Sequence, residues 1–234
     1  MANGKSGDKG LRAIVIGMIV FVITVTGIFI YFDKKPATNV AAPAAISKTD
    51  GSGLVFNPEL KNQIDIWEDF QCPACRSFEA TNNDYIKKMI LEKKAKVVYH
   101  PLTFIGERSS NGVNESIIAA NAAACAMDEG KFLEMHELIY QNQGNEENAG
   151  RFSKEFMIML GLKADLTSAK YQDCVRNGTY DDWTATSASY AAVKNVNSTP
   201  TVFVNGKELS RETPDNDYNN PAKFQAALAA VGIK

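Results

Sequence analysis

The sequence has 234 residues, of which 45% are hydrophobic, and a formal net charge of −2 at pH 7. That length and composition suffice for one ordinary domain plus an appendage, or for two small domains, with a sizeable core. The nearly balanced charge gives no support to nucleic-acid binding, which normally shows as a basic excess.

The N-terminal region contains a long apolar run. Residues 13–32 carry no charge, and a helix of that length spans about 30 Å, the thickness of the hydrocarbon core of a bilayer. A slight excess of basic residues before the run favours a cytoplasmic N-terminus. A cleaved signal peptide is the alternative, but signal h-regions are only about 7–15 residues long. We therefore predict a cytoplasmic segment at 1–12 and an uncleaved transmembrane anchor at 13–32.

A tether and a globular region follow the predicted anchor. Residues 33–53 are rich in Ala, Pro, Ser, Thr and Gly, which is typical of a semi-flexible linker. Residues 54–234 have a globular composition without an internal repeat. If the anchor is correct, this region lies outside the cytoplasm, where disulfides persist and the even number of cysteines, four, becomes meaningful.

The globular region begins and ends with β structure around a helical block. Residues 63–70 and 96–101 are predicted strands, and the helical pattern of 76–93 lies between them, which gives a βαβ unit. The predicted helices of the block are 114–127, 131–142, 153–160, 166–177 and 181–193. Strands 201–204 and 207–209 flank the hairpin signal Asn205-Gly206, and 221–231 is a final helix with Pro at its first turn. This order resembles an α/β thioredoxin fold with an all-helical subdomain inserted at about 107–195.

The segment Cys72-Pro73-Ala74-Cys75 lies at the predicted strand-to-helix junction. Cysteines at this spacing in a first helical turn can form a small disulfide, and Pro73 suits the first helical position because its missing N–H costs nothing there. Cys72 would face the unpaired N–H groups and the positive end of the helix dipole, which lower the pKa of a thiol. Cys75 is expected to be more buried and protonated. The motif predicts a redox pair, with Cys72 as nucleophile and Cys75 as resolving thiol.

Two other interpretations of this pair are half of a zinc site and an inert structural disulfide. Zinc needs four ligands, usually from a second Cys/His pair at similar spacing. The other two cysteines stand alone, and His100 and His136 are isolated in the sequence. We therefore expect no metal, and we place His136 at the surface or at its boundary. The position at a strand-to-helix junction favours the redox pair over the inert disulfide.

Three segments carry a family resemblance: IDIWEDFQCPACRSFE, AANAAACAMDEGKFLEMHELIY and NSTPTVFVNGKEL. Together they resemble the DsbA-like family of extracytoplasmic thiol–disulfide oxidoreductases, over roughly residues 57–234 and in the family's order. The resemblance implies a cis Thr199–Pro200 peptide that faces the cysteine pair, where the substrate backbone binds by strand-like pairing. It implies no cofactor.

Two positions depart from the best-known members of that family. The acidic residue six positions before the first cysteine is replaced by Ile66, which leaves the proton acceptor of the pair open. Glu68 is a candidate for this role, although a solvent-exposed Glu68 at a strand end is the favoured interpretation. The dipeptide Pro73-Ala74 between the cysteines also differs, and this leaves the redox potential open.

The remaining cysteines, Cys125 and Cys174, fall on different predicted helices of the insertion. Some DsbA-like proteins, particularly from actinobacteria, carry a second bridge of this kind, and we expect a structural disulfide here. The alternative is two buried free thiols that pack as small apolar residues.

These features predict a single-pass cell-membrane protein with an extracytoplasmic catalytic domain that oxidises reduced or unfolded exported proteins. Its redox partner in the membrane is expected to resemble DsbB or vitamin-K-epoxide reductase. A reductase or isomerase that a membrane electron donor keeps reduced is an alternative, and a redox-inactive chaperone or binding module is another. We expect a monomer, because no dimerisation domain precedes the first predicted strand of the βαβ unit.

Overall fold

The computed structural model describes residues 14–16, 18, 41–46, 51–211 and 218–234. The chain divides into two compact units, residues 1–40 and 41–234. The predicted cytoplasmic segment and all but four residues of the predicted anchor lie outside the described residues. Within the described ranges, no helix combines the length and the apolar character that crossing a membrane requires.

Part of the predicted linker belongs to the folded unit. Ile46 forms an isolated bridge with Leu54, and the N–H of Val55 donates to the carbonyl of Ala45 at 2.8 Å. Residues 41–46 therefore pack as an edge segment beside the sheet. Their Ala- and Pro-rich composition gave no sign of this, because the bonds are made by the backbone.

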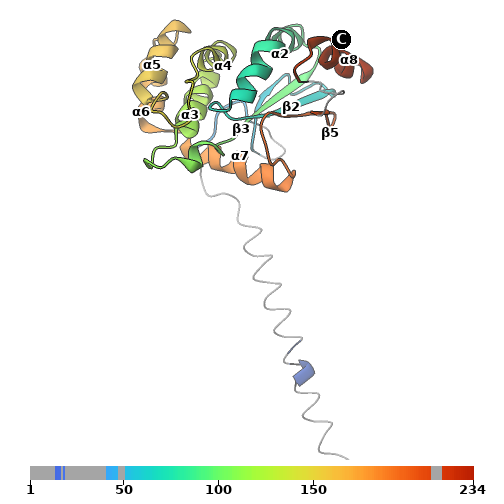
Figure 1. Ribbon diagram of the computed structural model, residues 1–234, viewed down its shortest axis with the longest axis horizontal. Helices are drawn as coiled ribbons and strands as arrows, with labels where there is room; N and C mark the ends of the chain where they lie inside the picture. Colours follow the sequence, from blue (N-terminus) through green and yellow to red (C-terminus); the bar gives the residue numbers. More distant parts are fainter. Residues whose placement is uncertain (1–13, 17, 19–40, 47–50, 212–217) are drawn as a thin grey trace, which may run out of the picture. The chain divides into compact units, whose positions relative to one another are not determined.

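A five-stranded sheet forms the centre of the second unit (Figure 1). Its strands are β1 (Leu54–Phe56), β2 (Gln63–Glu68), β3 (Lys96–Pro101), β4 (Thr201–Val204) and β5 (Lys207–Glu208). The spatial order is β1-β3-β2-β4-β5, with β2 and β3 parallel and the other neighbours antiparallel. The sequence did not reveal β1, because three residues are too few to show an alternating pattern.

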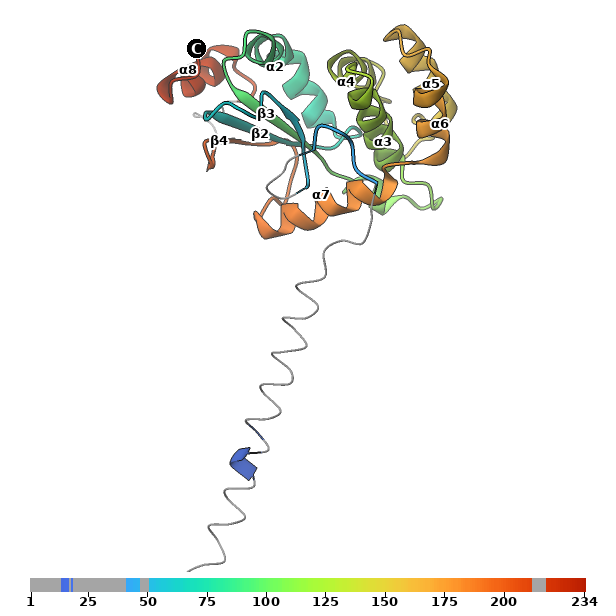
Figure 2. The same cartoon turned by 180° about the vertical axis from the view of Figure 1, so that it is seen from behind.

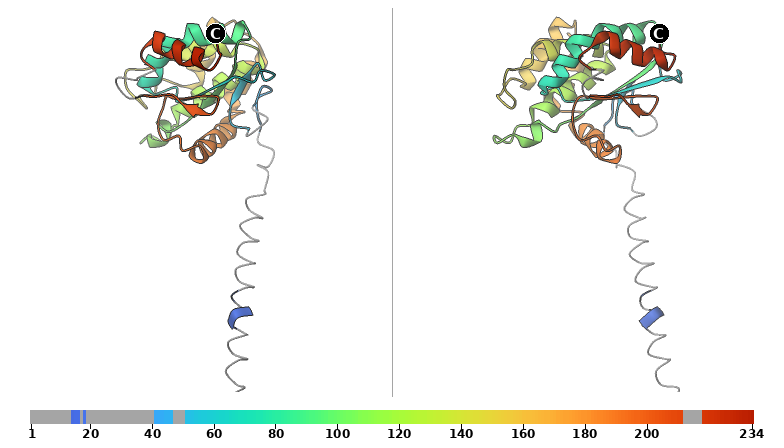
Figure 3. Two further views of the ribbon diagram at one scale, coloured as in Figure 1. Left: turned by 90° about the vertical axis from the view of Figure 1, so that its right-hand side faces the viewer. Right: turned by 45° about the vertical axis from the view of Figure 1, so that its right-hand side comes forward.

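Helices cover both faces of this sheet. Helices α2 (Pro73–Leu91) and α8 (Pro221–Ala230) lie on one face, and α7 (Asp181–Val193) lies on the other, as Figures 1 and 2 show from opposite sides. Figure 3 shows α8 alongside α2 above the strands. Because β2 is buried between these layers, Ile64 and Ile66 have no exposed surface.

The helical insertion lies between β3 and β4. It contains the 3-10 turn η1 (Gly106–Arg108), α3 (Glu115–Asp128), α4 (Phe132–Gln141), α5 (Lys154–Lys163) and α6 (Ala169–Asn177), and it ends with α7. Side-chain oxygens of Asn114, Ser153 and Ser168 cap α3, α5 and α6, and Gly178 ends α6 in the left-handed conformation. These caps set the helix ends: α6 begins three residues later than predicted because Ser168 precedes it. The order of elements is otherwise the predicted one, with the addition of β1.

Candidate active site

The cysteine pair lies at the N-terminus of α2, directly after the loop that follows β2. Cys72 is the N-cap residue, with extended backbone angles, and Pro73 occupies the first turn. Both thiols are free in this structure. Cys72 is 8% exposed, whereas Cys75 has no exposed surface. Only the first sulfur can therefore be reached by another molecule.

The two thiols have opposite pKa shifts. A hydrogen bond with the Cys75 thiol lowers the pKa of Cys72 to about 6, although burial acts in the other direction. The Thr199 side chain and the N–H groups of Cys75 and Ala74 also favour the thiolate. Burial raises the pKa of Cys75 well above its usual value, and the negative charges of Cys72 and Glu68 add to that rise. At neutral pH the pair therefore holds one thiolate and one thiol.

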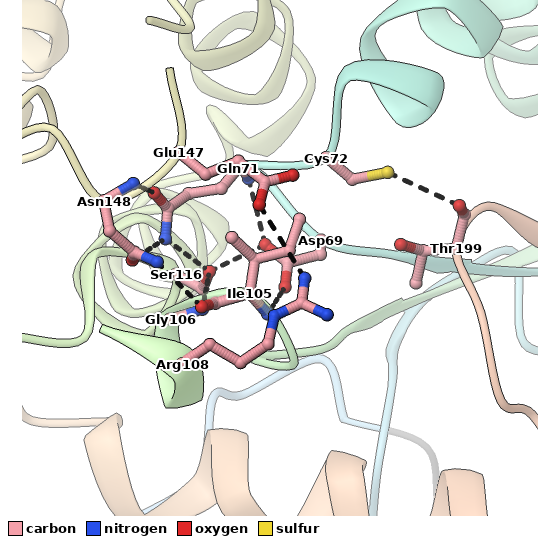
Figure 4. Close-up of polar contacts among 10 residues, drawn as sticks. All are labelled: Asp69, Gln71, Cys72, Ile105, Gly106, Arg108, Ser116, Glu147, Asn148 and Thr199. Carbon is pink, nitrogen blue, oxygen red and sulfur yellow. Dashed lines mark hydrogen bonds and ion pairs between the residues drawn. The ribbon is translucent and has the colours of Figure 1, made fainter. Parts of the chain in front are cut away.

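The loop before β4 faces Cys72. The Thr199–Pro200 peptide is cis, and the Sγ of Cys72 lies 3.4 Å from the carbonyl oxygen of Thr199 (Figure 4). Strand β4 pairs antiparallel with β2, with Thr201 opposite Trp67, so the loop and the cysteines meet at the same edge of the sheet. The structure thus brings Cys72 beside the Thr199–Pro200 loop, although Cys72 and Thr199 lie 127 positions apart in the chain.

A buried carboxylate that the sequence analysis did not single out anchors the loop before Cys72. Asp69 accepts hydrogen bonds from Ile105 N at 3.0 Å, from Gln71 N at 2.9 Å and from Ser116 Oγ at 2.7 Å (Figure 4). Burial raises the pKa of Asp69 to about 6 in spite of these bonds, and the charge of Cys72 contributes to the rise. An acidic residue between a buried strand and the cysteine pair was the signal that could have identified it.

The helical insertion supplies further contacts to this loop. The Nε2 of Gln71 donates to Ser116 Oγ at 2.9 Å and to Asn148 Oδ1 at 3.0 Å. The Nε2 of Gln143 donates to the carbonyl oxygens of Phe70 and Cys72, at 2.8 and 3.0 Å. The backbone that carries the nucleophile is therefore held by side chains of the insertion.

Glu68 lies in the interior, so the expected solvent-exposed position at a strand end is wrong. Its side chain is 1% exposed, and its Oε1 lies 2.7 Å from His136 Nε2. His136 has no exposed surface either, which corrects its predicted place near the surface. The opposite ring nitrogen, Nδ1, lies 3.8 Å from Glu79 Oε2. His136 is buried because its side of α4 packs against α2 and the sheet, which the amphipathic pattern alone could not show for a histidine.

Four aromatic rings surround the His136 imidazole. The ring centroids of Phe70, Tyr99, Phe132 and Tyr140 lie 4.8 to 5.6 Å from that of His136. Burial lowers the pKa of His136, but the charges of Glu68 and Glu79 outweigh burial and raise it above its usual value. Burial raises the pKa of Glu79 to about 8. In the cluster Glu68–His136–Glu79, the imidazole and the Glu79 carboxyl group therefore hold protons at neutral pH.

The same three residues are the ones that could hold a cation. Ligating atoms of Glu68, Glu79 and His136 lie within 4.8 Å of one another, and no other such group occurs among the described residues. No cysteine belongs to the group. The other histidine, His100, lies 3.0 Å from Asp65 Oδ1 through its Nε2 and stacks on Trp67. The zinc interpretation of the cysteine pair therefore gains no support.

Cys125 and Cys174 form a disulfide between α3 and α6, with their Cα atoms 6.0 Å apart. Both lie within the helical insertion, where they tie its first helix to its fourth. The bridge is separate from the pair at the start of α2, whose cysteines remain free.

A family model and several relatives connect this chain with thioredoxin-like disulfide oxidoreductases. A family model described as thioredoxin matches residues 50–229. A probable disulfide bond formation protein D from Bacillus anthracis is 27% identical over 220 residues, which cover 86% of this chain and 90% of the relative. A putative protein-disulfide oxidoreductase from Rickettsia typhi is 23% identical over 72% of this chain, and the match spans 60% of the length of that relative. The reduced disulfide bond oxidoreductase DsbG from Mycobacterium tuberculosis matches with a TM-score of 0.61 and 26% identity, over 83% of this chain and 88% of its own.

Proposed function

Because this chain belongs to the thioredoxin family and resembles disulfide oxidoreductases of the DsbA type, we propose that it is an extracytoplasmic thiol–disulfide oxidoreductase that oxidises the thiols of exported proteins. One observation carries the proposal. Cys72, at a helix N-terminus, keeps 8% of its surface exposed and has a pKa of about 6, whereas its fully buried neighbour Cys75 has a pKa well above the usual value. An accessible sulfur that is stable as a thiolate is a good leaving group in disulfide exchange.

The reaction begins from the Cys72–Cys75 disulfide. A substrate thiolate attacks the sulfur of Cys72, the bond between the two cysteines breaks, and Cys75 leaves as a thiolate that takes up a proton. A second substrate thiolate then attacks the substrate sulfur of the mixed disulfide, and Cys72 leaves as a thiolate. The substrate has lost two electrons and the enzyme pair has gained them. The low pKa of Cys72 favours the second step because it stabilises that leaving thiolate.

Glu68 is the proposed group that exchanges a proton with Cys75. Its charge is one of those that raise the pKa of Cys75, and it is hydrogen-bonded to His136 in the buried cluster. Glu79 lies one helical turn beyond Cys75 on the buried side of α2, where residues four apart are neighbours. The cluster supplies the proton when Cys75 leaves, and it takes the proton back during reoxidation. It thus fills the role left open by Ile66.

Substrate binding is assigned to the Thr199–Pro200 loop. Its carbonyl lies beside the Cys72 sulfur, and a peptide that pairs with this loop as an additional strand would present a cysteine to Cys72. The proposed substrates are reduced or unfolded proteins, because such pairing uses backbone atoms and requires an extended segment.

Reoxidation requires an electron acceptor for the reduced pair. We assign this role to a membrane oxidoreductase of the DsbB or vitamin-K-epoxide-reductase kind, and we assign residues 13–32 as the anchor that keeps the catalytic domain near it. The uncharged run of these residues supports the assignment.

The test is a single-turnover oxidation of a reduced dithiol peptide by the preoxidised full chain. We expect intramolecular disulfide formation in the peptide with loss of one enzyme disulfide. Cys72→Ala should abolish the reaction, whereas Cys75→Ala should accept a covalent adduct at Cys72 from an activated peptide disulfide. The double variant C125A/C174A is the control that should retain the activity. A wild-type chain that leaves the peptide reduced would support a redox-inactive binding module instead.

A further inference from the structure

Cys72 meets the Thr199–Pro200 loop only if two separate elements are held in a fixed relation. The cysteine lies at the N-terminus of α2, and the loop precedes β4, a strand of the sheet on which α2 packs (Figure 2). The pairing of β2 with β4 ends at Thr201, opposite Trp67. The loop therefore lies beyond the last paired residue of β4, and its position depends on further contacts.

Tyr218 bonds to both of these elements. Its hydroxyl oxygen accepts a hydrogen bond from the backbone N–H of Val202, on β4, at 2.8 Å. Its carbonyl oxygen accepts from the Nδ2 of Asn82, on α2, at 2.7 Å. Val202 comes two residues after Pro200, and Asn82 lies about two helical turns after Cys75. We refer to this link from Asn82 through Tyr218 to Val202 as the Tyr218 connection.

The Tyr218 connection is buried and packed against aromatic rings. Tyr218 is 4% exposed, and Asn82 is 1% exposed. The Tyr218 ring meets Phe78 of α2 edge to face, with ring centroids 5.6 Å apart, and Phe78 meets Phe224 of α8 in the same way at 5.7 Å. Hydrogen bonds in such low-dielectric surroundings are stronger than those exposed to water. The connection is therefore suited to hold α2 and β4 in one relation.

The short strand β5 leaves the N–H of Val202 to Tyr218. The two residues of β5 pair with Phe203 and Val204 of β4, and Val202 has no exposed surface. A buried backbone N–H without a partner costs free energy, so the Tyr218 hydroxyl satisfies this donor. Loss of that one oxygen would release β4 at the end that carries the substrate loop.

The loop has a second support on its exposed side. The Nη1 of Arg211 donates to the Oγ of Ser198, and the Nη2 donates to the Oε1 of Glu208 at 3.1 Å. Loss of the Tyr218 hydroxyl should therefore displace the loop rather than unfold it.

We propose that Tyr218 is a positioning residue, which fixes the Thr199–Pro200 loop at the distance from Cys72 at which a substrate backbone can pair. This rests on the function proposed above and adds the residue that sets the geometry of peptide binding. Loosening the Tyr218 connection should weaken the binding of a peptide more than it slows the exchange step.

The variant Tyr218→Phe removes only the hydroxyl oxygen and keeps the ring. The preoxidised full chain is mixed with excess reduced dithiol peptide, and the rate at which the enzyme disulfide is lost is measured against peptide concentration. We expect the half-saturation concentration to rise about two- to tenfold, the effect of one hydrogen bond, with a limiting rate close to that of the wild type. Dithiothreitol has no peptide backbone to pair with the loop, so its oxidation should be unaffected. Tyr85→Phe, at a half-buried position of α2, is the matched control.

A second variant cuts the connection at its other end. Asn82→Ala removes the bond to α2 and leaves the bond to Val202. It should raise the half-saturation concentration in the same way, and N82A/Y218F should not exceed the larger single effect, because both substitutions break one connection. In the reduced chain, the midpoint of Cys72 alkylation should also rise in both single variants, since Thr199 is one of the groups that lower the pKa of Cys72.

The proposal is overturned if Tyr218→Phe lowers the free energy of unfolding but leaves both the half-saturation concentration and the alkylation midpoint as in the wild type. It is also overturned if dithiothreitol and the peptide are affected alike, or if the effects of the two substitutions multiply. A wild-type chain that leaves the peptide reduced would contradict the oxidase function instead, and the alkylation midpoints would then decide on the positioning role.

Discussion

The different behaviour of Cys72 and Cys75 follows from a single turn of helix. Cys72, as N-cap residue, meets backbone N–H groups that have no partner inside the helix. Cys75, three residues later, is buried in the core and has no exposed surface. The same backbone geometry thus makes one sulfur a stable thiolate and keeps the other protonated, and each stabilises the other through their mutual hydrogen bond.

The Cys72 titration should depend on Cys75. In the reduced chain we expect the rate of alkylation by iodoacetamide to rise with pH around a midpoint near 6, since only the thiolate reacts. Cys75→Ala removes the hydrogen bond that lowers this pKa most, so the midpoint should move up by about one unit or more. Cys125 and Cys174 do not interfere because they are joined. An unchanged midpoint would show that the helix N-terminus alone sets the pKa.

Proton exchange with Cys75 should be slowed by Glu68→Gln. The amide keeps an oxygen that can accept from His136 but cannot take up a proton. We expect the attack of Cys75 on a glutathione adduct at Cys72 to slow by roughly 10²-fold at neutral pH, the lower end of typical general-base effects. Stopped-flow release of glutathione measures this step. Glu59→Gln, at an exposed position, is the matched control; equal rates in the two variants would remove Glu68 from the mechanism.

The sequence could identify the reactive pair but not its buried surroundings. The motif and its position after a strand identify Cys72 and Cys75 as the reactive pair, because the positive end of a helix dipole favours a thiolate at the helix N-terminus. The inward direction of His136 depends on how α4 packs against α2, a tertiary contact. Asp69 was missed because its partners, Ile105 and Ser116, come from segments far along the chain.

The insertion contributes to the site as well as to the fold. Helix α4 supplies His136, the start of α3 supplies Ser116, and the segment after α4 supplies Gln143. Its helices were predicted to within a few residues because their caps and apolar spacing are local signals. Strand β1 and the edge segment 41–46 were not predicted, since the backbone bonds from β1 to β3 and from residues 45 and 46 to β1 leave no side-chain pattern in the sequence.

The bridge between α3 and α6 should stabilise the insertion without taking part in exchange. It closes a loop with a sequence separation of 49, for which the chain-entropy relation gives about 4 kcal/mol. We expect C125A/C174A to lower the free energy of unfolding by up to that amount in urea titrations. Its dithiol oxidation rate at low denaturant should match that of the wild type. A large loss of rate with unchanged stability would instead assign this bridge a redox role.

The two compact units are proposed to have separate tasks, attachment and catalysis. If residues 13–32 form an uncleaved anchor, the full chain should sediment with membranes and resist extraction by carbonate. A version beginning at residue 41 and carrying its own export signal should be released in soluble form. A membrane-impermeant maleimide should label Cys72 in reduced intact cells. Recovery of a shortened N-terminus by sequencing of the mature protein would favour the cleaved signal instead.

The direction of electron flow follows from the relative stability of the reduced and oxidised pairs. A pKa of about 6 stabilises the Cys72 thiolate, and hence the reduced form, at every pH above that value. This effect raises the redox potential and makes the pair a better oxidant. Burial keeps the pKa of Cys75 well above its usual value, so Cys75 stays protonated in the reduced pair at pH 7 and does not add to this effect.

The equilibrium of the Cys72–Cys75 pair with glutathione tests this account most directly. The oxidised fraction is measured by tryptophan emission or by alkylation across a series of glutathione ratios at pH 7. We expect a potential of about −120 mV, the range of a strong thiol oxidant. A value of about −270 mV, typical of a reductant such as thioredoxin, would contradict the oxidase and assign the same two cysteines to disulfide reduction.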